Sequence, residues 1–446
     1  MNEHDQFDAF DRDDDILAQR RQKRLEMKRK RIMRQRIILA SAAGVLVLLL
    51  ILLLSRCSKP KQPEIGTPPP TIPVVEEVKV QNVTATVSAV GDIMMYDTQI
   101  KAGQIDETTY DFSDSFKAVM AHTISPDLMV GNLELNFLGY APYAGNPQAL
   151  PYFNSPEVLA SNLSAIGFDI LQTANTYSIV NGITGLQSTI NFLNQSSIDH
   201  VGTHGTNPAQ SGSSGVVLRE VNGIKIAFIG FTKGLNGFTL PTNNQYSVDL
   251  LYTDYNTTFE EINYTAIADR INAAKSHEPD VIIAMLHWGS EYAIFNKEDD
   301  KSTQAEIRDL MFKNGVDVIL GSHSHVVGPM EMVDVKTNDG EEKKCFVAYS
   351  LGNFFSDMSK DFTQESVILN LEFTKDGETG DTEITDVNYV PLYILDRGED
   401  ATETRFEVLP IRKAIATSNF KEYEDVMNAA IENLKTNTAS NYDSGE

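Results

Sequence analysis

Two short apolar runs that end near histidine constrain the fold of this chain more than any other feature. Residues 281–286 lead directly into His287, and residues 316–320 are soon followed by His323 and His325. Continuous apolar runs of this length, bounded by glycine and polar residues, are typical of strands buried on both faces of a layered α/β sheet. Ligands of such sheets collect just beyond the carboxyl ends of the strands. The sequence therefore predicts that the three histidines lie at one edge of a sheet.

The spacing of these histidines favours a metal site. His323 and His325 share one side of their strand, because side chains alternate along a strand with a period of two. Together with a carboxylate, neutral imidazole nitrogens can hold a metal ion. The alternative is that each histidine is a polar loop residue that only makes hydrogen bonds. Three of the chain's eight histidines occupy such positions, so we favour a site.

Strands and helices alternate along most of the chain, and a block of strands follows. This order predicts a layered α/β core of two sheets in one domain. Asn222-Gly223 separates two apolar runs and is the strongest hairpin signal in the sequence. We expect strands at 83–90, 127–130, 168–173, 200–202, 216–220, 224–230, 281–286, 316–320, 327–335, 344–350, 367–373 and 384–395, and helices at 112–123, 155–166, 257–276, 303–313 and 423–434, with one more beginning near residue 184.

The first 55 residues read as a membrane anchor. Ten of the seventeen residues at 20–36 are Lys or Arg, and residues 37–55 are nineteen uncharged, leucine-rich residues. As a helix they can cross a hydrocarbon core of about 30 Å. The preceding basic flank predicts a cytoplasmic basic tail at 1–36, a transmembrane signal anchor at 37–55 and an extracellular main domain. We therefore expect a single-pass protein of the cell membrane, in a Gram-positive bacterium. A cleaved signal peptide is the alternative, but its hydrophobic region is normally shorter.

The rest of the chain divides into three parts. Residues 56–79 are rich in proline, which predicts an extended, semi-rigid extracellular stalk. We expect one folded domain at 80–415, and a C-terminal helix with a disordered tail at 416–446. The 410 residues after the basic tail carry 26 Lys or Arg and 54 Asp or Glu. This surplus argues against nucleic acid as a partner, and it would repel a polyanion unless metal ions or local basic patches intervene.

Further polar residues stand at the ends of predicted strands. Asp92 ends the first strand, Glu134 follows the second, and Asn175 follows the third. Two carboxylates, three imidazoles and an amide suit one or two divalent ions. A carboxylate can bridge two cations about 3.5–4 Å apart and so help to create a nucleophilic hydroxide. These residues together predict a metal centre.

Six short motifs occur in order along the chain: Gly91-Asp92-Ile93-Met94, Asn132-Leu133-Glu134, Gly167-Phe168-Asp169, His287-Trp288-Gly289-x-Glu291, Gly321-x-His323-x-His325 and Ser350-Leu351-Gly352-Asn353-Phe354. Together they resemble the CapA/PgsA family of capsule or poly-γ-glutamate synthesis proteins, over roughly residues 83–395. The resemblance implies a calcineurin-like metallophosphoesterase fold, which is a four-layer α/β sandwich, here preceded by one transmembrane helix. It also implies that one or two divalent ions (Mn, Fe or Zn) are bound by Asp92, Glu134, His287, His323 and His325.

One loop departs from the pattern of that family. The family has Asn-Asn-His after the third strand, with Asp three residues later, whereas this chain has Asn175-Thr176-Tyr177 followed by Val180. Tyr177 therefore stands where the resemblance implies a catalytic histidine, but a neutral tyrosine with a pKa near 10 is a poor proton shuttle at pH 7. Threonine is also a weaker metal ligand than an amide oxygen. Either Asn175 shifts into the ligand position, or the site binds metal poorly.

Three more side chains are candidates with two interpretations each. Glu291 is either catalytic or a residue that orients His287. Asn353 either contacts ligand or belongs to a tight strand-to-loop turn. His204 either replaces the missing histidine in binding or is a solvated loop residue. The only tryptophan, Trp288, is expected to pack beside the site.

Three functions remain open. The first is a membrane-anchored extracellular accessory protein for the synthesis, export or anchoring of capsular poly-γ-glutamate or a related anionic polymer, with membrane components of a synthase or export complex as partners. The second is a metal-dependent hydrolase, either phosphoesterase-like or polymer-cleaving. The third is a degenerate polymer-binding module that has lost the chemistry. The resemblance and the N-terminal segments favour the first, and the altered loop favours the third over the second.

Overall fold

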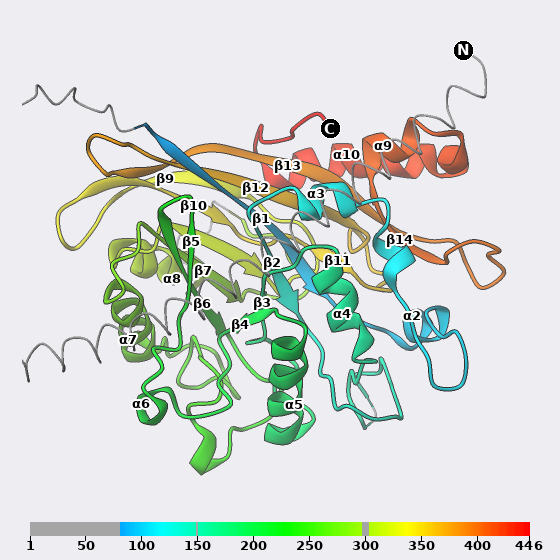
Figure 1. The fold of residues 1–446 in the computed structure, drawn as a ribbon, viewed down its shortest axis with the longest axis horizontal. Helices are drawn as coiled ribbons and strands as arrows, with labels where there is room; N and C mark the ends of the chain where they lie inside the picture. The colour runs from blue at the N-terminus through cyan, green and yellow to red at the C-terminus, as the bar shows by residue number, and fades with distance from the viewer. Residues whose placement is uncertain (1–80, 149, 297–302) are drawn as a thin grey trace, which may run out of the picture. The chain divides into compact units, whose positions relative to one another are not determined.

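Two β-sheets build the domain in the computed structural model, which describes residues 81–148, 150–296 and 303–446 (Figure 1). The predicted basic tail, signal anchor and stalk all lie outside these residues. Among the residues described, no helix combines the length and the apolar character that crossing a bilayer requires.

The first sheet has eight strands, in the order β14-β13-β12-β1-β2-β3-β4, with β11 paired to β1. Strands β1 to β4 are parallel, and β12 to β14 are antiparallel. The C-terminal ends of the parallel strands all lie at one edge of this sheet. The strands are β1 (Val83–Ile93), β2 (Leu128–Leu133), β3 (Ile170–Gln172), β4 (Asp199–Val201), β11 (Asn353–Phe355), β12 (Glu365–Lys375), β13 (Thr382–Asp396) and β14 (Phe406–Pro410).

The second sheet has six strands, in the order β5-β6-β7-β8-β10-β9. Four of them are parallel, and their register pairs Thr232 with His287 and His287 with Ser322. The strand that ends at His287 and the strand that leads to His323 therefore end side by side, as their apolar runs predicted. The strands are β5 (Val217–Val221), β6 (Ile224–Thr232), β7 (Val281–His287), β8 (Val318–Ser322), β9 (Met330–Lys336) and β10 (Glu342–Ala348).

Alternation along the strands divides the core into layers. In β1, Val87 faces a cluster between the sheets that also contains Ile283 and Val318. The next residues on the other face, such as Val90, pack with Leu163 of a helix outside the first sheet. Each fully buried aliphatic side chain contributes about 1.5–3 kcal/mol relative to exposure. The result is an α/β fold with helices outside both sheets. The helical segments before residue 320 are α2 (Asp97–Ala102), η1 (Ser113–Phe116), α3 (Met120–Ile124), α4 (Val158–Ala165), α5 (Gly182–Gln195), α6 (Pro208–Ser211), η2 (Thr242–Asn244), α7 (Tyr264–Lys275) and α8 (Thr303–Lys313).

Local signals set the ends of several elements. The predicted hairpin between β5 and β6 is confirmed, with positive φ at both Asn222 and Gly223, as its two-residue turn requires. The predicted helix at 257–276 is too long, because α7 begins only at Tyr264. The side chain of Asn263 accepts a hydrogen bond from the Ala266 amide and caps this later start. The predicted helix at 112–123 is divided into η1 and α3.

The C-terminal segment is part of the folded domain, so the predicted disordered tail is wrong for the residues that follow the helix. Helices α9 (Ile411–Ile415) and α10 (Glu424–Thr438) and the turn η3 (Ser418–Tyr423) lie beside β13 and β14, as Figure 1 shows. The buried side chains of Met427 and Leu434 join the core between the sheets. Beyond α10, Tyr442 and Ser444 make backbone hydrogen bonds to Tyr389 of β13. An apolar helix face and a short added strand pairing hold this segment in place.

Candidate metal centre

The C-terminal edges of the two sheets meet at a cluster of buried polar side chains. Asp92 lies near the end of β1, and Glu134 follows β2 directly. His287 is the last residue of β7, and His323 and His325 follow β8. Asp92, Glu134 and His287 are fully buried, and the other two are less than a tenth exposed. The structure therefore brings together all five residues for which metal ligation was predicted.

Glu134 is the residue that these ligands share. Possible ligand atoms of Glu134, His287 and His323 lie within 4.8 Å of one another, and so do those of Asp92, Glu134 and His325. This arrangement allows one carboxylate to bridge two cations. The prediction of one or two divalent ions is compatible with these two overlapping sets.

The surroundings of Glu134 test whether the cluster fits a cation. Both carboxylate oxygens are buried and accept no hydrogen bond from any described donor. The His287 ring lies beside them, with its Nε2 3.3 Å from Oε1. A buried carboxylate that accepts no hydrogen bond is costly unless a cation compensates its charge. Oxygen and imidazole donors together suit Mn, Fe or Zn, so the residues present fit a bound divalent metal.

Asp92 is held in its ionised form. Its Oδ1 accepts a 2.7 Å hydrogen bond from Asn132, and its Oδ2 lies 3.1 Å from Nδ1 of His325. Burial alone would raise the pKa of Asp92, but the contact and charge of His325, together with the charge of His287 and the hydrogen bond from Asn132, lower it. The same pair raises the pKa of His325 to about 9 even though burial opposes this change. By contrast, burial and the neighbouring histidines lower the pKa of His323 well below its ordinary value.

The imidazole of His287 is oriented from both ends. Its Nδ1 lies 3.0 Å from the Ser322 hydroxyl and 3.4 Å from the Asn132 amide. Its Nε2 lies 2.9 Å from Oγ1 of Thr176. Glu291 is exposed and makes no hydrogen bond to His287 within the described parts of the chain. Ser322 and Asn132 therefore orient the His287 ring. The interpretation that Glu291 orients this ring is wrong, and a catalytic role of Glu291 stays a prediction.

Thr176 occupies the gap in the altered loop. Its hydroxyl reaches both His287 and His323, the latter at 3.5 Å. Asn175 does not shift into this position, because its amide donates to Asn132 Oδ1 at 3.1 Å and to the Leu133 carbonyl at 2.7 Å. The first of the two alternatives for this loop is therefore wrong. Asn175 instead ties the loop to the end of β2.

Tyr177 lies beside the cluster in an environment that keeps it neutral. Its ring packs against Phe153, with 4.5 Å between the ring centroids. Burial, followed by the charge of Glu134, raises the pKa of Tyr177 far above its usual range. Tyr177 cannot exchange protons readily at neutral pH, which agrees with the expectation that it is a poor shuttle. Its catalytic role stays a prediction.

Asn353 contacts a predicted ligand, and its amide orientation is fixed. Its Oδ1 lies 3.0 Å from Nδ1 of His325, and its Nδ2 donates to the Thr363 carbonyl. This pairing directs Nε2 of His325 away from Asn353. The structure thus gives Asn353 a positioning contact, whereas binding of a ligand by Asn353 remains a prediction.

His204 lies in a polar network of its own. Its Nε2 is 3.0 Å from Oδ2 of Asp249 and 3.1 Å from Nη2 of Arg270, which also donates to Asp249 at 2.7 Å. Its side chain is buried, so it is not the solvated loop histidine that was one interpretation. Its Nε2 is therefore already occupied by Asp249 and Arg270, and among the described contacts His204 makes none with the candidate metal ligands.

Backbone strain and close packing mark the second histidine loop. His323 and His325 have φ of +94° and +60°, in a region that residues other than glycine rarely adopt. Gly321 lies so close to the Tyr349 carbonyl that a Cβ there would approach it to 2.0 Å. Trp288 also donates to this carbonyl, at 2.9 Å, and is fully buried. Trp288 thus packs beside the site, as expected.

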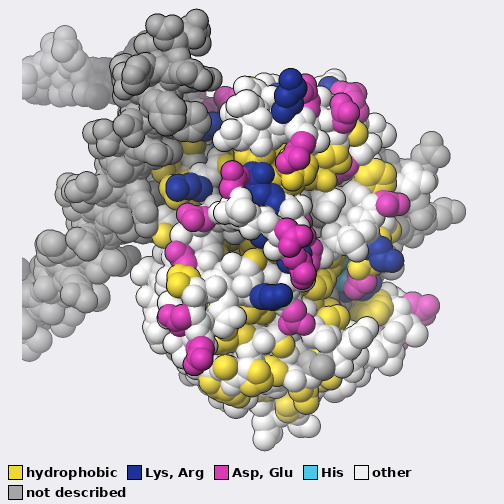
Figure 2. Space-filling model, turned by 90° about the vertical axis from the view of Figure 1, so that its right-hand side faces the viewer, with side chains coloured by type: hydrophobic (Ala, Val, Ile, Leu, Met, Phe, Trp, Pro, Cys, Tyr) yellow, Lys and Arg dark blue, Asp and Glu magenta, His cyan; other side chains and the backbone are white. Residues whose placement is uncertain are grey.

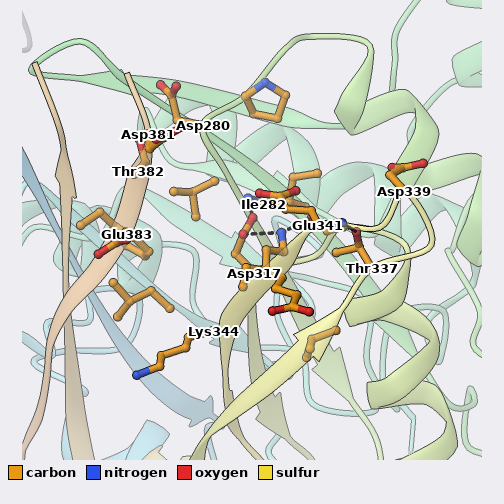
Figure 3. A pocket seen from close by; sticks show the side chains of 18 of the residues that line it. Asp280, Ile282, Asp317, Thr337, Asp339, Glu341, Lys344, Asp381, Thr382 and Glu383 are labelled. Atoms are coloured by element: carbon orange, nitrogen blue, oxygen red, sulfur yellow. Dashed lines mark hydrogen bonds and ion pairs between the residues drawn. The ribbon is translucent and has the colours of Figure 1, made fainter. Parts of the chain in front are cut away.

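A separate cavity of about 1200 Å³ lies at the opposite, N-terminal ends of β7 and β8 (Figure 3). Many acidic side chains line it, and two of them form ion pairs. Asp280 pairs with Lys375 at 2.7 Å, and Asp317 pairs with Lys343 at 2.6 Å. The cavity has no donor set comparable with that around Glu134.

Comparisons with known proteins agree with the sequence motifs. Residues 86–358 match the model of a family described as "Bacterial capsule synthesis protein PGA_cap". The chain is 27% identical to "PGA biosynthesis protein CapA" of Bacillus subtilis (strain 168) over 305 residues, which cover 68% of this chain and 70% of that protein. It is 26% identical to "Capsule biosynthesis protein CapA" of Bacillus anthracis over 321 residues, which cover 70% of this chain and 68% of that protein.

Likeness to solved structures is weaker. A phosphatase from Mycoplasma pneumoniae aligns with a TM-score of 0.37 and 13% identity, covering 70% of this chain and 94% of that chain. At these values neither the fold nor the chemistry of that phosphatase carries over. What the site can do therefore has to follow from its own residues.

Proposed function

The chain belongs to the family of bacterial capsule synthesis proteins, and we propose that it is a membrane-anchored extracellular accessory protein for the synthesis, export or anchoring of capsular poly-γ-glutamate or a related polymer. The names of the two Bacillus relatives support the polymer class. The nineteen uncharged residues at 37–55 and their basic flank support the anchoring. Its partners in this role are the membrane components of the polymer synthase or export complex.

The candidate metal centre supports a second part of this proposal, which concerns the binding of divalent ions. We infer a calcineurin-like metallophosphoesterase fold that binds divalent ions through Asp92, Glu134 and the three histidines. The observation that carries this inference is the buried carboxylate of Glu134, which belongs to both ligand sets and has no hydrogen-bond donor. A bound divalent ion would act there as a Lewis acid and lower the pKa of a coordinated water.

The chain's own residues prepare the site for such an ion. Asp92 stays ionised because of its contact with His325, and His287 is held by Ser322 and Asn132. Two parts differ from what a hydrolase needs, because Tyr177 is a neutral phenol and Thr176 replaces an amide. A polymer-binding module that has lost its chemistry is therefore the competing interpretation of the same site.

A comparison of two strains with the native one tests the proposal. One strain lacks the gene, and the other produces the Glu134→Gln chain at the native level. Capsular polymer is measured on the cells and in the medium. Loss in both strains is the result expected for a role that uses the metal centre. Loss in the deletion strain alone identifies an accessory role without metal chemistry, and unchanged polymer in the deletion strain contradicts the proposed function.

A further inference from the structure

Lys233 lies directly beyond β6, next to the strand that carries His287. Its backbone N–H donates to the His287 carbonyl at 2.8 Å. Its Nζ donates to the Gly289 carbonyl at 2.5 Å and lies 4.6 Å from the centroid of the Phe259 ring. The ammonium group is therefore fixed beside the segment that leads from His287 to Glu291.

The charge of Lys233 has no carboxylate partner in the described parts of the chain. Lys233 is partly buried, and its described contacts are the Gly289 carbonyl and the Phe259 ring. Two other partly buried cations of the domain do have a carboxylate partner: Lys343 pairs with Asp317, and Arg270 pairs with Asp249. Partial burial of an unpaired charge is unfavourable, and it is a recurrent property of functional sites.

Lys233 also lies next to a strand end that carries a candidate metal ligand. It directly follows Thr232, which is paired with His287 in the register of β6 and β7. A second cation lies near the third histidine. Lys360 Nζ is 5.9 Å from the ring of Tyr292, and this ring is 6.0 Å from that of His325. Two lysines therefore lie near the cluster, together with the carboxylate of Glu291.

This local charge bears on how an acidic domain could accept an anionic ligand. On the described part of the face in Figure 2, basic side chains are interspersed with acidic ones and form no broad patch. A polyanion approaching such a surface is repelled unless single, well-placed cations attract it. Lys233 can act as such a cation. The Gly289 carbonyl uses only one of the three N–H donors of its ammonium group, so the others can reach an anion.

We propose that Lys233 is an anion-binding residue of the metal centre, whose ammonium group binds a carboxylate or phosphate oxygen of the ligand. The inference rests on the proposed function, since it places an anionic ligand beside the divalent ions. Both ligand classes share one chemistry, an anionic oxygen that accepts a charge-assisted hydrogen bond from lysine. A carboxylate would come from a γ-linked glutamate chain, and a phosphate from a phosphorylated precursor or ester.

Binding measurements on the full-length chain in detergent test this assignment. The probes are a γ-linked glutamate oligomer and inorganic phosphate, each titrated by calorimetry in the presence of Mn²⁺. The variant is Lys233→Gln, and the matched control is Lys225→Gln. Lys225 lies at the other end of β6, is also partly buried, and its side chain has no ion pair within the described residues. Thermal melting of both variants verifies that they fold.

We expect Lys233→Gln to weaken binding about tenfold or more, because a hydrogen bond to a charged group is worth about 1.5–3 kcal/mol. Lys225→Gln should bind as the native chain does, and Lys233→Arg should retain most of the affinity. Weaker binding of the oligomer alone identifies the carboxylate source, and weaker binding of phosphate alone identifies the phosphate source. Unchanged affinity for both probes overturns the assignment, and so does an equal loss in the Lys225 variant. Either result leaves the deletion experiment on the capsule unaffected, so the two failures are distinguishable.

Discussion

The hydroxyl oxygen of Thr176 lies 2.9 Å from Nε2 of His287, the ring nitrogen that faces the carboxylate of Glu134. A threonine hydroxyl in this position hydrogen-bonds a ligand nitrogen, where an amide oxygen could instead coordinate a cation. The altered loop is therefore part of the candidate metal centre, and its effect on metal affinity can be measured directly.

Replacing Thr176 by Asn should strengthen metal binding. The amide oxygen is a better ligand for a divalent cation than a hydroxyl, so we expect the dissociation constant to fall about tenfold. Competition with a chelator of known affinity measures this change. Thr176→Val is the matched control, since it keeps the shape and removes the hydroxyl. Equal affinities of the Asn and Val variants would show that this position does not contact the ion.

Replacing Glu134 by Gln should change the stability of the metal-free protein and its response to added metal in different directions. The buried carboxylate has no hydrogen-bond donor, so its removal should stabilise the metal-free protein by about 1–3 kcal/mol. The native protein should be further stabilised by added metal, because the ion binds only the folded state. Thermal melting with EDTA and with Mn²⁺ tests both statements. A native protein that melts at the same temperature in both conditions would contradict metal binding at this site.

Replacing Asn353 by Ala should weaken metal binding without unfolding the domain. Asn353 fixes the ring of His325 through a 3.0 Å contact, and loss of such a partner typically costs 10–100-fold in metal affinity. Asn370→Ala is a matched control, because its amide also makes two side-chain hydrogen bonds, to Ser88 and Asn388 in the sheet. Metal content at a fixed free Mn²⁺ concentration distinguishes the two variants. A similar loss in both would mean that the effect is a general loss of sheet stability.

Glu365 should make the stability of the domain depend on pH. Burial raises the pKa of this carboxyl to about 7, although a hydrogen bond from Asn433 of α10 lowers it. The folded-state pKa thus exceeds the unfolded value, so the contribution to stability is complete below about pH 4.5 and is lost as the pH rises through 7. We expect a loss of about 1–3 kcal/mol over this range, allowing for partial solvent screening.

Urea unfolding of Glu365→Gln at several pH values measures this loss. The variant should keep nearly the same free energy of unfolding at pH 5 and pH 8, whereas the native chain should be less stable at pH 8. Parallel curves for the two proteins would assign the pH dependence to other groups.

The positions of the ligands could be predicted because they depend on strand ends. Apolar runs before His287 and His323 mark buried strands, and the carboxyl ends of parallel strands meet wherever the sheets pack. The roles of Asn132 and Lys233 could not be predicted from the sequence. Each lies at or just beyond the end of a strand, but its role depends on contacts between segments far apart in the chain, which no local pattern indicates. For Asn132, the only signal in the sequence was its place in the motif Asn132-Leu133-Glu134.

Errors in the secondary structure have the same physical origin. The helix expected from residue 257 begins at Tyr264, because a cap at Asn263 competes with the helical spacing that precedes it. The tail after α10 was expected to be disordered because it is polar. In the fold, Tyr442 and Ser444 instead complete backbone hydrogen bonds of β13, which depends on tertiary proximity.

Strand β1 joins the place where the chain enters the domain to the place where the ligands meet. At its start, Asn82 accepts a hydrogen bond from the Gly377 amide, and Asp92 stands near its other end. Eleven residues of strand span roughly 33 Å. Residue 81, where the described domain begins, consequently lies at the end of β1 that is remote from the candidate metal centre. A ligand that approaches this centre therefore need not pass residue 81.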